Sequence, residues 1–114
     1  MKTFDLSRLK ENDREAVLEA VRTLKERFPV TRVVLFGSKA EGLDDPESDI
    51  DLLVLTRGKL PWRERDKIVG SLFDTQLKYD VVFGVLVVSE GEWDEGLSTV
   101  LPIHLEIEEH GALV

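Results

Sequence analysis

Apolar residues with helical spacing alternate along the chain with short apolar runs typical of buried strands, and this alternation constrains the fold more than any other feature. In the first helical segment, apolar side chains recur at three- and four-residue steps from Val17 to Phe28. Asn12 is placed to cap the start of this helix and Pro29 to end it. The β-branched run over residues 32–36 then predicts the first buried strand.

The alternation continues through the rest of the sequence. Residues 49–55 predict a second strand, residues 62–78 a helix whose apolar stripe covers one face of the sheet, and residues 79–88 a third strand. Ser89 is placed for a capping box, and residues 102–110 predict a last short helix. This order of elements favours an α/β (α+β) architecture in which helices cover a small β-sheet.

Size and composition point to one compact domain. A chain of 114 residues can bury only one hydrophobic core, so we expect a single domain over residues 1–114. The absence of cysteine excludes disulfides, zinc–thiolate centres and cysteine nucleophiles. No apolar run reaches the ~18 residues of a membrane span, and no apolar leader follows Met1. We therefore expect a cytoplasmic protein without membrane contact.

The net charge of −8 is concentrated in the last third of the chain. All 15 Lys and Arg residues lie within residues 1–78, whereas residues 79–114 hold 8 of the 23 acidic residues. Nucleic-acid binding needs clustered cations, so this distribution argues against direct contact with nucleic acid. The acidic end either keeps the protein soluble, which is the simpler interpretation, or binds a basic protein partner.

Two carboxylates open the second predicted strand. Side chains alternate along a strand, so Asp49 and Asp51 project from the same face, two steps of ~3.3 Å apart. Ile50 and Leu52 point to the opposite, buried face, so a compensating positive charge is expected beside the acids. Hard cations such as Mg²⁺ bind carboxylate oxygens together with substrate phosphates. The pair therefore predicts a metal site, with a solvated edge strand as the alternative.

Asp80 stands at the start of the third predicted strand. If that strand lies beside the second, the Asp80 carboxylate reaches the same pocket as Asp49 and Asp51. It would then bind the metal or accept the proton of an attacking hydroxyl group. The alternative is an ordinary polar residue at the start of a strand.

Gly37 and Ser38 end the first strand and can supply donors for an anion. Glycine lets the backbone approach a bulky anion, and amides that open a helical turn carry a favourable dipole. Ser38 adds a hydroxyl donor, Gly42 a second flexible point, and Lys39 a cation for phosphate. An anion cradle followed ten residues later by a carboxylate pair predicts a site that holds a polyphosphate through metal.

The motif consists of Leu35-Phe36-Gly37-Ser38 with Ala40 and Gly42, followed by Ser48-Asp49-Ile50-Asp51-Leu52. This Gly-Ser pair with a spaced Asp-x-Asp resembles the signature of the polymerase-beta-like nucleotidyltransferase superfamily, and the small size resembles its minimal branch, often called MNT. The resemblance implies the palm fold of that superfamily, with a small mixed sheet covered by helices. It also implies site roles. Nucleotide phosphates would be held at Gly37, Ser38, Lys39 and Gly42, and two Mg²⁺ ions by the catalytic Asp49, Asp51 and Asp80.

The resemblance implies a Mg²⁺-dependent enzyme that transfers AMP from ATP to an acceptor hydroxyl and releases pyrophosphate. Members of the minimal branch are often paired with a small helical HEPN-type protein, so it also implies the antitoxin of an MNT/HEPN toxin–antitoxin pair, with the partner as acceptor. Glu41 stands where such proteins commonly carry Arg. This difference keeps a second function open, in which the chain inhibits its partner by occlusion without chemistry. The sequence leaves the oligomeric state open, self-association included.

Overall fold

The computed structural model describes residues 1–42 and 48–114, with Leu97 and Ser98 described by their backbone alone. The strands are β1 (Lys2–Thr3), β2 (Val30–Phe36), β3 (Ile50–Thr56), β4 (Phe83–Ser89) and β5 (Ala112–Leu113). The α-helices are α1 (Glu11–Arg27), α2 (Trp62–Gly70), α3 (Phe73–Tyr79), α4 (Glu90–Glu95) and α5 (Pro102–His110). Short 3-10 helices, η1 (Leu6–Arg8) and η2 (Leu97–Val100), precede α1 and follow α4.

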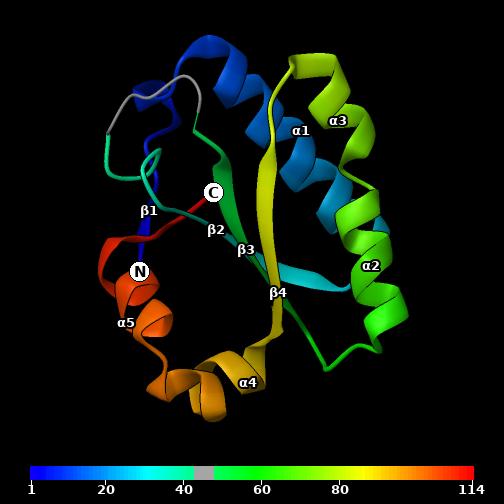
Figure 1. Ribbon diagram of the computed structural model, residues 1–114, viewed down its shortest axis with the longest axis vertical. Helices are drawn as coiled ribbons and strands as arrows, with labels where there is room; N and C mark the ends of the chain where they lie inside the picture. The colour runs from blue at the N-terminus through cyan, green and yellow to red at the C-terminus, as the bar shows by residue number, and fades with distance from the viewer. Residues whose placement is uncertain (43–47) are drawn as a thin grey trace.

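The strands form one mixed sheet in the order β1-β5-β2-β3-β4 (Figure 1). Strands β2 and β3 run antiparallel, and Phe36 pairs with Asp51. Strands β3 and β4 run parallel, and Asp51 pairs with Gly84. The predicted architecture, a small mixed sheet covered by helices, is confirmed. Its register places Asp51 between the end of β2 and the beginning of β4.

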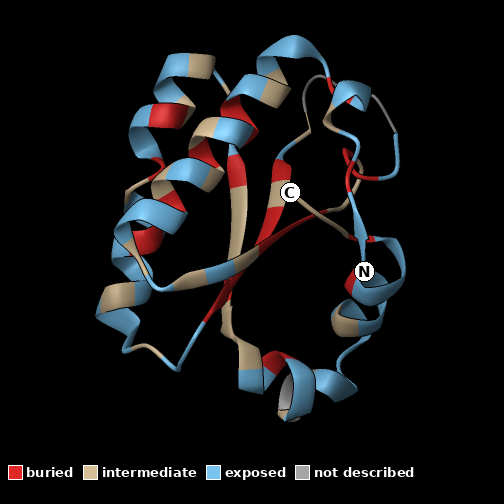
Figure 2. Cartoon of the chain, turned by 180° about the vertical axis from the view of Figure 1, so that it is seen from behind, coloured by how far each residue is buried: buried red, intermediate tan, exposed pale blue. Residues whose placement is uncertain are grey.

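Helices cover the two faces of the sheet unequally. On one face, α1, α2 and α3 pack on a core that includes Leu52 of β3. On the other face, Leu53 packs with Trp93 of α4 and Ile107 of α5. Figure 2 shows buried residues along the strands and on the inner sides of the helices. Because side chains alternate along a strand, Asp51 projects on the same face as Leu53.

The helix predicted over residues 62–78 is two helices in the structure. Helix α2 ends at Gly70 and α3 begins at Phe73. Between them, the Ser71 hydroxyl donates a hydrogen bond to the carbonyl of Ile68 at 2.6 Å. A side chain that bonds to a preceding carbonyl competes with the regular helical pattern, and this explains the break here.

The apolar stripe of this segment covers the sheet less than predicted. Ile68 and Leu72 are buried against the sheet, as expected. Val69, Phe73 and Leu77 are instead 47%, 58% and 66% exposed, so the prediction was wrong for these three side chains. The predicted stripe is therefore wider than the part of it that packs on the sheet.

The third strand begins later than predicted. Tyr79 is the last residue of α3, and Asp80 follows it in the left-handed conformation, with φ 52° and ψ 51°. Strand β4 begins only at Phe83. An apolar run does not distinguish the end of a packed helix from the start of a buried strand, which is why the predicted boundary at residue 79 was wrong.

Asn12 does not cap α1, contrary to the prediction. The helix begins at Glu11, and Lys10 occupies the cap position without a side-chain hydrogen bond to the helix. The Asn12 side-chain amide donates instead to the carbonyl of Tyr79, at 2.7 Å. This hydrogen bond connects the start of α1 to the end of α3, directly beside Asp80.

The predictions for the last third of the chain fit the structure more closely. Ser89 accepts a hydrogen bond from the amide of Glu92 at 3.2 Å and caps α4, and α5 spans the predicted residues 102–110. β5, a strand of only two residues, is not predicted by the sequence pattern. Within the described ranges, every helix is too short or too polar to cross a membrane.

Candidate functional site

The carboxylate of Asp51 lies between two glycines, Gly84 on β4 and Gly37 directly after β2. A Cβ atom added to Gly84 of β4 would stand 2.5 Å from Asp51 Oδ1, and one added to Gly37 would overlap Oδ2. Gly37 also has a φ of +76°, a conformation that residues with side chains rarely adopt. These two positions therefore require glycine for the carboxylate to stand where it does.

Asp51 is half-buried, and its surroundings disfavour a negative charge. Burial raises the pKa of the Asp51 carboxyl above its usual range, and the charge of Asp49 raises that pKa further. Neither acid forms an ion pair within residues 1–42 and 48–114. Two neighbouring carboxylates of this kind present hard oxygen ligands, and their electrostatics fit a divalent cation of the Mg²⁺ type.

Asp49 precedes β3 directly and is exposed to solvent. It lines a cavity of about 370 Å³ together with Ser48, Asp80 and the α1 residues Asn12 and Asp13. Two of the predicted site acids therefore share one cavity, although they are distant in the sequence. Their common position beside the first residues of β3 makes this end of the sheet the candidate site.

Asp80 reaches the cavity from the end of a helix rather than from a strand. The residue opposite Asp51 on β4 is Gly84, so β4 contributes no carboxylate at that level of the sheet. Among the described side chains, Asp49, Asp51 and Asp80 do not form a group whose ligand atoms all lie within 4.8 Å of one another. The structure thus brings Asp80 to Asp49, but the predicted convergence of all three acids is not seen.

The backbone after Gly37 forms the turn that the sequence predicts. The carbonyl of Gly37 accepts hydrogen bonds from the amides of Ala40 at 3.1 Å and Glu41 at 3.3 Å. The first amides of such a helical turn have no carbonyl partner within the turn. They can therefore donate hydrogen bonds to an anion. Ser38 stands first in this turn, next to the glycine that contacts Asp51.

Lys39 lies elsewhere than the phosphate prediction requires. Its side chain is only 4% exposed, and Nζ lies 2.9 Å from Asp13 Oδ2 on α1. The lysine therefore holds the turn against α1. Arg8 is a cation that the sequence analysis missed, and a Cβ atom added to Gly42, which has a φ of +75°, would lie 3.0 Å from its guanidinium. No pattern around Arg8 identifies it, because the chain brings η1 to the turn only in the folded state.

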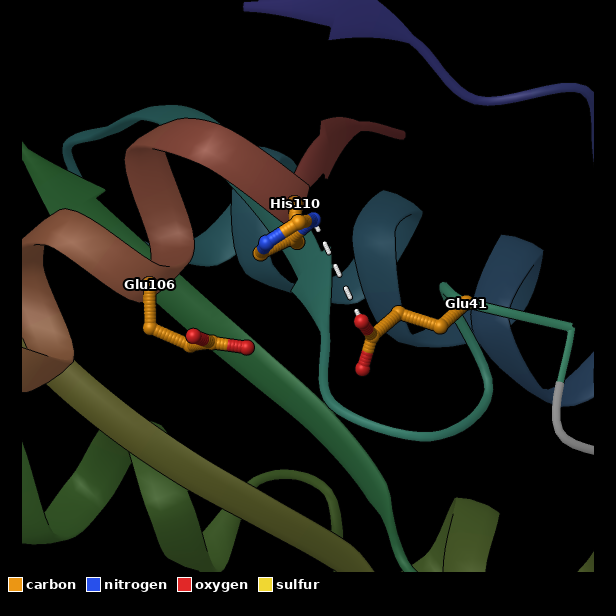
Figure 3. Close-up of side chains that lie close together, drawn as sticks. All are labelled: Glu41, Glu106 and His110. Atoms are coloured by element: carbon orange, nitrogen blue, oxygen red, sulfur yellow. Dashed lines mark ion pairs between the residues drawn. The ribbon is translucent and has the colours of Figure 1, made fainter.

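Glu41 follows the turn and takes part in a second group of side chains, which Figure 3 shows. Glu41 and His110 lie 4.0 Å apart, between Oε1 and Nδ1. Ligand atoms of Glu41, Glu106 and His110 lie within 4.8 Å of one another, but all three residues are exposed. Exposed groups of this composition commonly hold no ion, so we do not interpret this group as a metal centre. It does show that Glu41 extends towards α5.

The sequence matches the model of a nucleotidyltransferase domain over residues 17–108. A protein of Methanocaldococcus jannaschii named "Putative protein adenylyltransferase" is 39% identical over 77 residues, which cover 62% of this chain and 78% of that protein. The matched region of the family model includes the Gly37 turn, Asp49, Asp51 and Asp80.

Solved structures share the fold at lower identity. The crystal structure of a toxin-antitoxin with AMP-PNP has a TM-score of 0.57 and 18% identity, and the match covers 91% of this chain and 72% of that one. A structure described as a "putative nucleotidyltransferase" from Sulfolobus solfataricus has a TM-score of 0.55 and 22% identity, over 95% and 80% of the two chains. At these identities the likeness shows the fold.

Proposed function

The chain belongs to the nucleotidyltransferase domain family, and we propose that it transfers AMP from ATP to a hydroxyl group of a partner protein and releases pyrophosphate. Nucleotidyl transfer itself follows from the family, and the similarity to an adenylyltransferase supports AMP as the transferred group. ATP as the donor is supported by a structure of the same fold that contains AMP-PNP, an analogue of ATP.

One observation carries the proposal, namely the position of Asp51 beside the Gly37 turn. The carboxylate contacts the glycine at which β2 ends and the turn begins. An acidic group and a set of amide donors therefore stand next to each other without a side chain between them. Nucleotidyl transfer needs such a pair of neighbours, because the phosphates need both a metal ligand and anion donors.

The donor set fits Mg²⁺, and we assign Asp49 and Asp51 as the residues that hold the ions, two in the expected arrangement. Both are carboxylates, and burial together with the neighbouring charge of Asp49 raises the pKa of Asp51, as expected for a pair that binds a cation. Bound there, the metal supplies charge neutralisation for the α-phosphate and for the departing pyrophosphate.

The remaining roles concern the chain itself. The amide and hydroxyl of Ser38 donate hydrogen bonds to phosphate oxygens, and Gly37 and Gly42 let the backbone come close to the nucleotide. Lys39 positions this turn through its ion pair with Asp13. Catalysis then comes mainly from alignment of the acceptor oxygen with the α-phosphorus.

Asp80 acts on the acceptor in this proposal. As the acceptor oxygen forms its bond to the α-phosphorus, the bond from that phosphorus to the pyrophosphate oxygen breaks, and the acceptor's proton passes to Asp80. The position of Asp80 in the cavity that Asp49 lines supports this role. Asp49 and Asp80 are both exposed to solvent, so an acceptor protein can reach them.

We propose that the acceptor is a small helical HEPN-type protein and that this chain is the antitoxin of the pair. The toxin-antitoxin with which it shares a fold supports this assignment. Inhibition by occlusion is the second candidate. It is favoured by Glu41, whose negative charge stands on the turn that would bind phosphates.

The decisive experiment incubates the chain with a HEPN-type partner, Mg²⁺ and ATP labelled at the α-phosphate. We expect label on the partner and a mass increase of one AMP by mass spectrometry. Asp51→Asn should abolish the transfer, while Asp74→Asn, which removes an exposed carboxylate of α3, should leave it intact. Transfer that survives Asp51→Asn would overturn the mechanism, and a stable complex without modification would support occlusion.

A further inference from the structure

The corner of the molecule formed by α4, η2 and α5 combines exposed acids with exposed apolar side chains. We call the exposed acids of these helices, together with the apolar residues between them, the acidic face. Its carboxylates are Glu92, Asp94, Glu95, Glu106, Glu108 and Glu109, and its apolar residues are Val100, Leu101, Ile103 and Leu105. Figure 1 shows these helices together below the sheet, on the side away from α1.

The charge of this face is one-sided. Residues 79–114 contain no Lys or Arg, so the helices of this corner have no cation of their own apart from any protonated histidine. Arg32 of β2 is bound by Glu90 at 2.9 Å and lies 3.8 Å from Asp94. His110 lies 3.8 Å from Glu109, and Lys2 and Arg8 line a cavity together with Glu108 and Glu109. Among the described residues of α4 and α5, the acids outnumber these cations, so the net charge of the corner is negative.

The apolar side chains of the acidic face are unusually exposed for their size. Val100 is 78% exposed, Leu101 50% and Leu105 60%. Leu101 is the N-cap residue of α5, and Leu105 lies in the second turn of the helix. Glu109 follows Leu105 by four residues, on the same side of the helix. The result is a ridge that is apolar at one end and acidic at the other.

A second apolar stripe does not share this charge pattern. Trp62, Val69, Phe73 and Leu77 on α2 and α3 are 47% to 67% exposed. Residues 62–79 carry both signs of charge in close mixture, so nothing there selects one kind of occupant. The stripe therefore serves as the matched control for the acidic face.

We propose that the acidic face binds an amphipathic helix with lysine and arginine on its polar side, contributed by the partner protein. The apolar ridge anchors the helix, and the carboxylates steer it and fix its orientation. This inference rests on the proposed function only in that a partner protein exists, since binding here needs neither nucleotide nor metal. The surface that binds the partner would thus be distinct from the catalytic site, because the acidic face lies on α4 and α5 and does not line the cavity of Asp49.

The test uses the full chain and synthetic helical peptides that contain only leucine and lysine, or leucine and glutamate. We expect the lysine peptide to bind, with an affinity that falls as salt is added, and the glutamate peptide not to bind. Leu105→Ser and the pair Glu106→Lys with Glu109→Lys should each weaken binding about tenfold or more, measured by fluorescence anisotropy. Hydrogen exchange should show protection confined to residues 90–110.

Matched substitutions elsewhere decide whether the location is specific. Phe73→Ser removes an equally exposed apolar side chain from α3, and Glu15→Lys with Glu26→Lys makes the same change of net charge on α1. Neither should change the affinity by more than about twofold. Equal weakening by these controls would overturn the proposal. So would a dimer of the chain, seen by sedimentation, that Leu105→Ser dissociates, because the face would then be a self-interface.

The same peptides separate this inference from the catalytic proposal. Asp51→Asn should bind the lysine peptide as tightly as the unmodified chain does. AMP transfer that persists in this variant, with intact peptide binding, would refute the catalytic assignment alone. Loss of peptide binding in the Leu105→Ser variant, with transfer to a small hydroxyl acceptor unchanged, supports recognition at the acidic face.

Discussion

The carboxylate of Asp51 lies against the backbone of Gly84, its partner on the parallel strand β4, so closely that a Cβ atom at Gly84 would stand 2.5 Å from Oδ1. The other oxygen faces Gly37 in the same way. The direction of this acid is thus determined by two residues that have no side chains. Substitution of Gly37 or Gly84 should therefore impair AMP transfer, just as substitution of Asp51 should.

Gly84→Ala is expected to reduce AMP transfer by about a hundredfold, because the added methyl group forces the Asp51 carboxylate to turn. The backbone of Gly84 has no positive φ, so alanine is compatible with the strand. Stability should consequently change by less than about 1 kcal/mol. Transfer kinetics and thermal unfolding of the same variant measure the two effects separately.

Gly91→Ala provides the matched control. Gly91 lies in α4, and a Cβ atom there meets nothing within 4 Å. Alanine should stabilise the helix by about 0.5–1 kcal/mol and leave transfer unchanged. Equal transfer rates in Gly84→Ala and Gly91→Ala would show that the contact with Asp51 does not matter.

Asp51→Asn should raise the melting temperature of the metal-free protein. The raised pKa of Asp51 means that the fold disfavours its negative charge, and asparagine keeps the shape without the charge. Addition of Mg²⁺ should raise the melting temperature of the unmodified chain but not that of the variant, because a ligand stabilises only a state that binds it. Differential scanning calorimetry with and without Mg²⁺ measures both. A lower melting temperature in the metal-free variant would contradict the electrostatic interpretation.

Asp13→Ala should destabilise the protein by about 2–3 kcal/mol, because it removes the ion pair of the buried Lys39. It should also weaken ATP binding, since the turn after Gly37 would lose its connection to α1. The double variant Asp13→Asn with Lys39→Met removes both charges and should recover much of the stability. Denaturant unfolding of the single and double variants gives the comparison, and equal losses in the two would argue against a charge effect.

Glu90→Gln should cost about 1 kcal/mol at neutral pH, because Glu90 binds Arg32 through both carboxylate oxygens and also accepts a hydrogen bond from Thr31. These partners, Arg32 foremost, hold the pKa of Glu90 below its usual 4.5. A lowered folded-state pKa contributes stability above the unfolded-state value and loses it as the pH falls through the folded-state value. The difference between the two proteins should therefore shrink as the pH falls below 4.5, which unfolding curves at several pH values would show. A difference that persists in strong acid would mean that packing, not charge, is responsible.

Much of the fold follows from sequence patterns, because strands β2 and β3 are buried on both sides and have unambiguous apolar runs. The sequence pattern does not predict where α3 ends and β4 begins. Residues 79–88 are mostly apolar, and this character fits the end of a helix as well as a strand. The break at Ser71 depends on a single hydroxyl group that bonds to Ile68, which no periodicity reveals. Local competition of this kind decides where elements end.

The parts of the candidate site that consecutive residues form could be predicted from the sequence. The contacts between distant segments could not. Gly37 and Ser38 form the expected turn because consecutive residues determine it. Lys39 turns to Asp13 because α1 supplies a buried carboxylate within reach, and only the packed structure reveals that contact. The approach of Arg8 to Gly42 has the same origin.

The shortest strands have a consequence for how the molecule is made. β5 lies between β1 and β2, where the carbonyl of Leu113 accepts from the amide of Phe4 at 2.7 Å and the amide of Val114 donates to Val33 at 3.0 Å. During synthesis the ribosome delivers β1 first, yet β1 finds its neighbour only when residue 113 has left the exit tunnel. Until then one edge of β2 has no strand partner, and its backbone groups can bind a chaperone or another nascent chain.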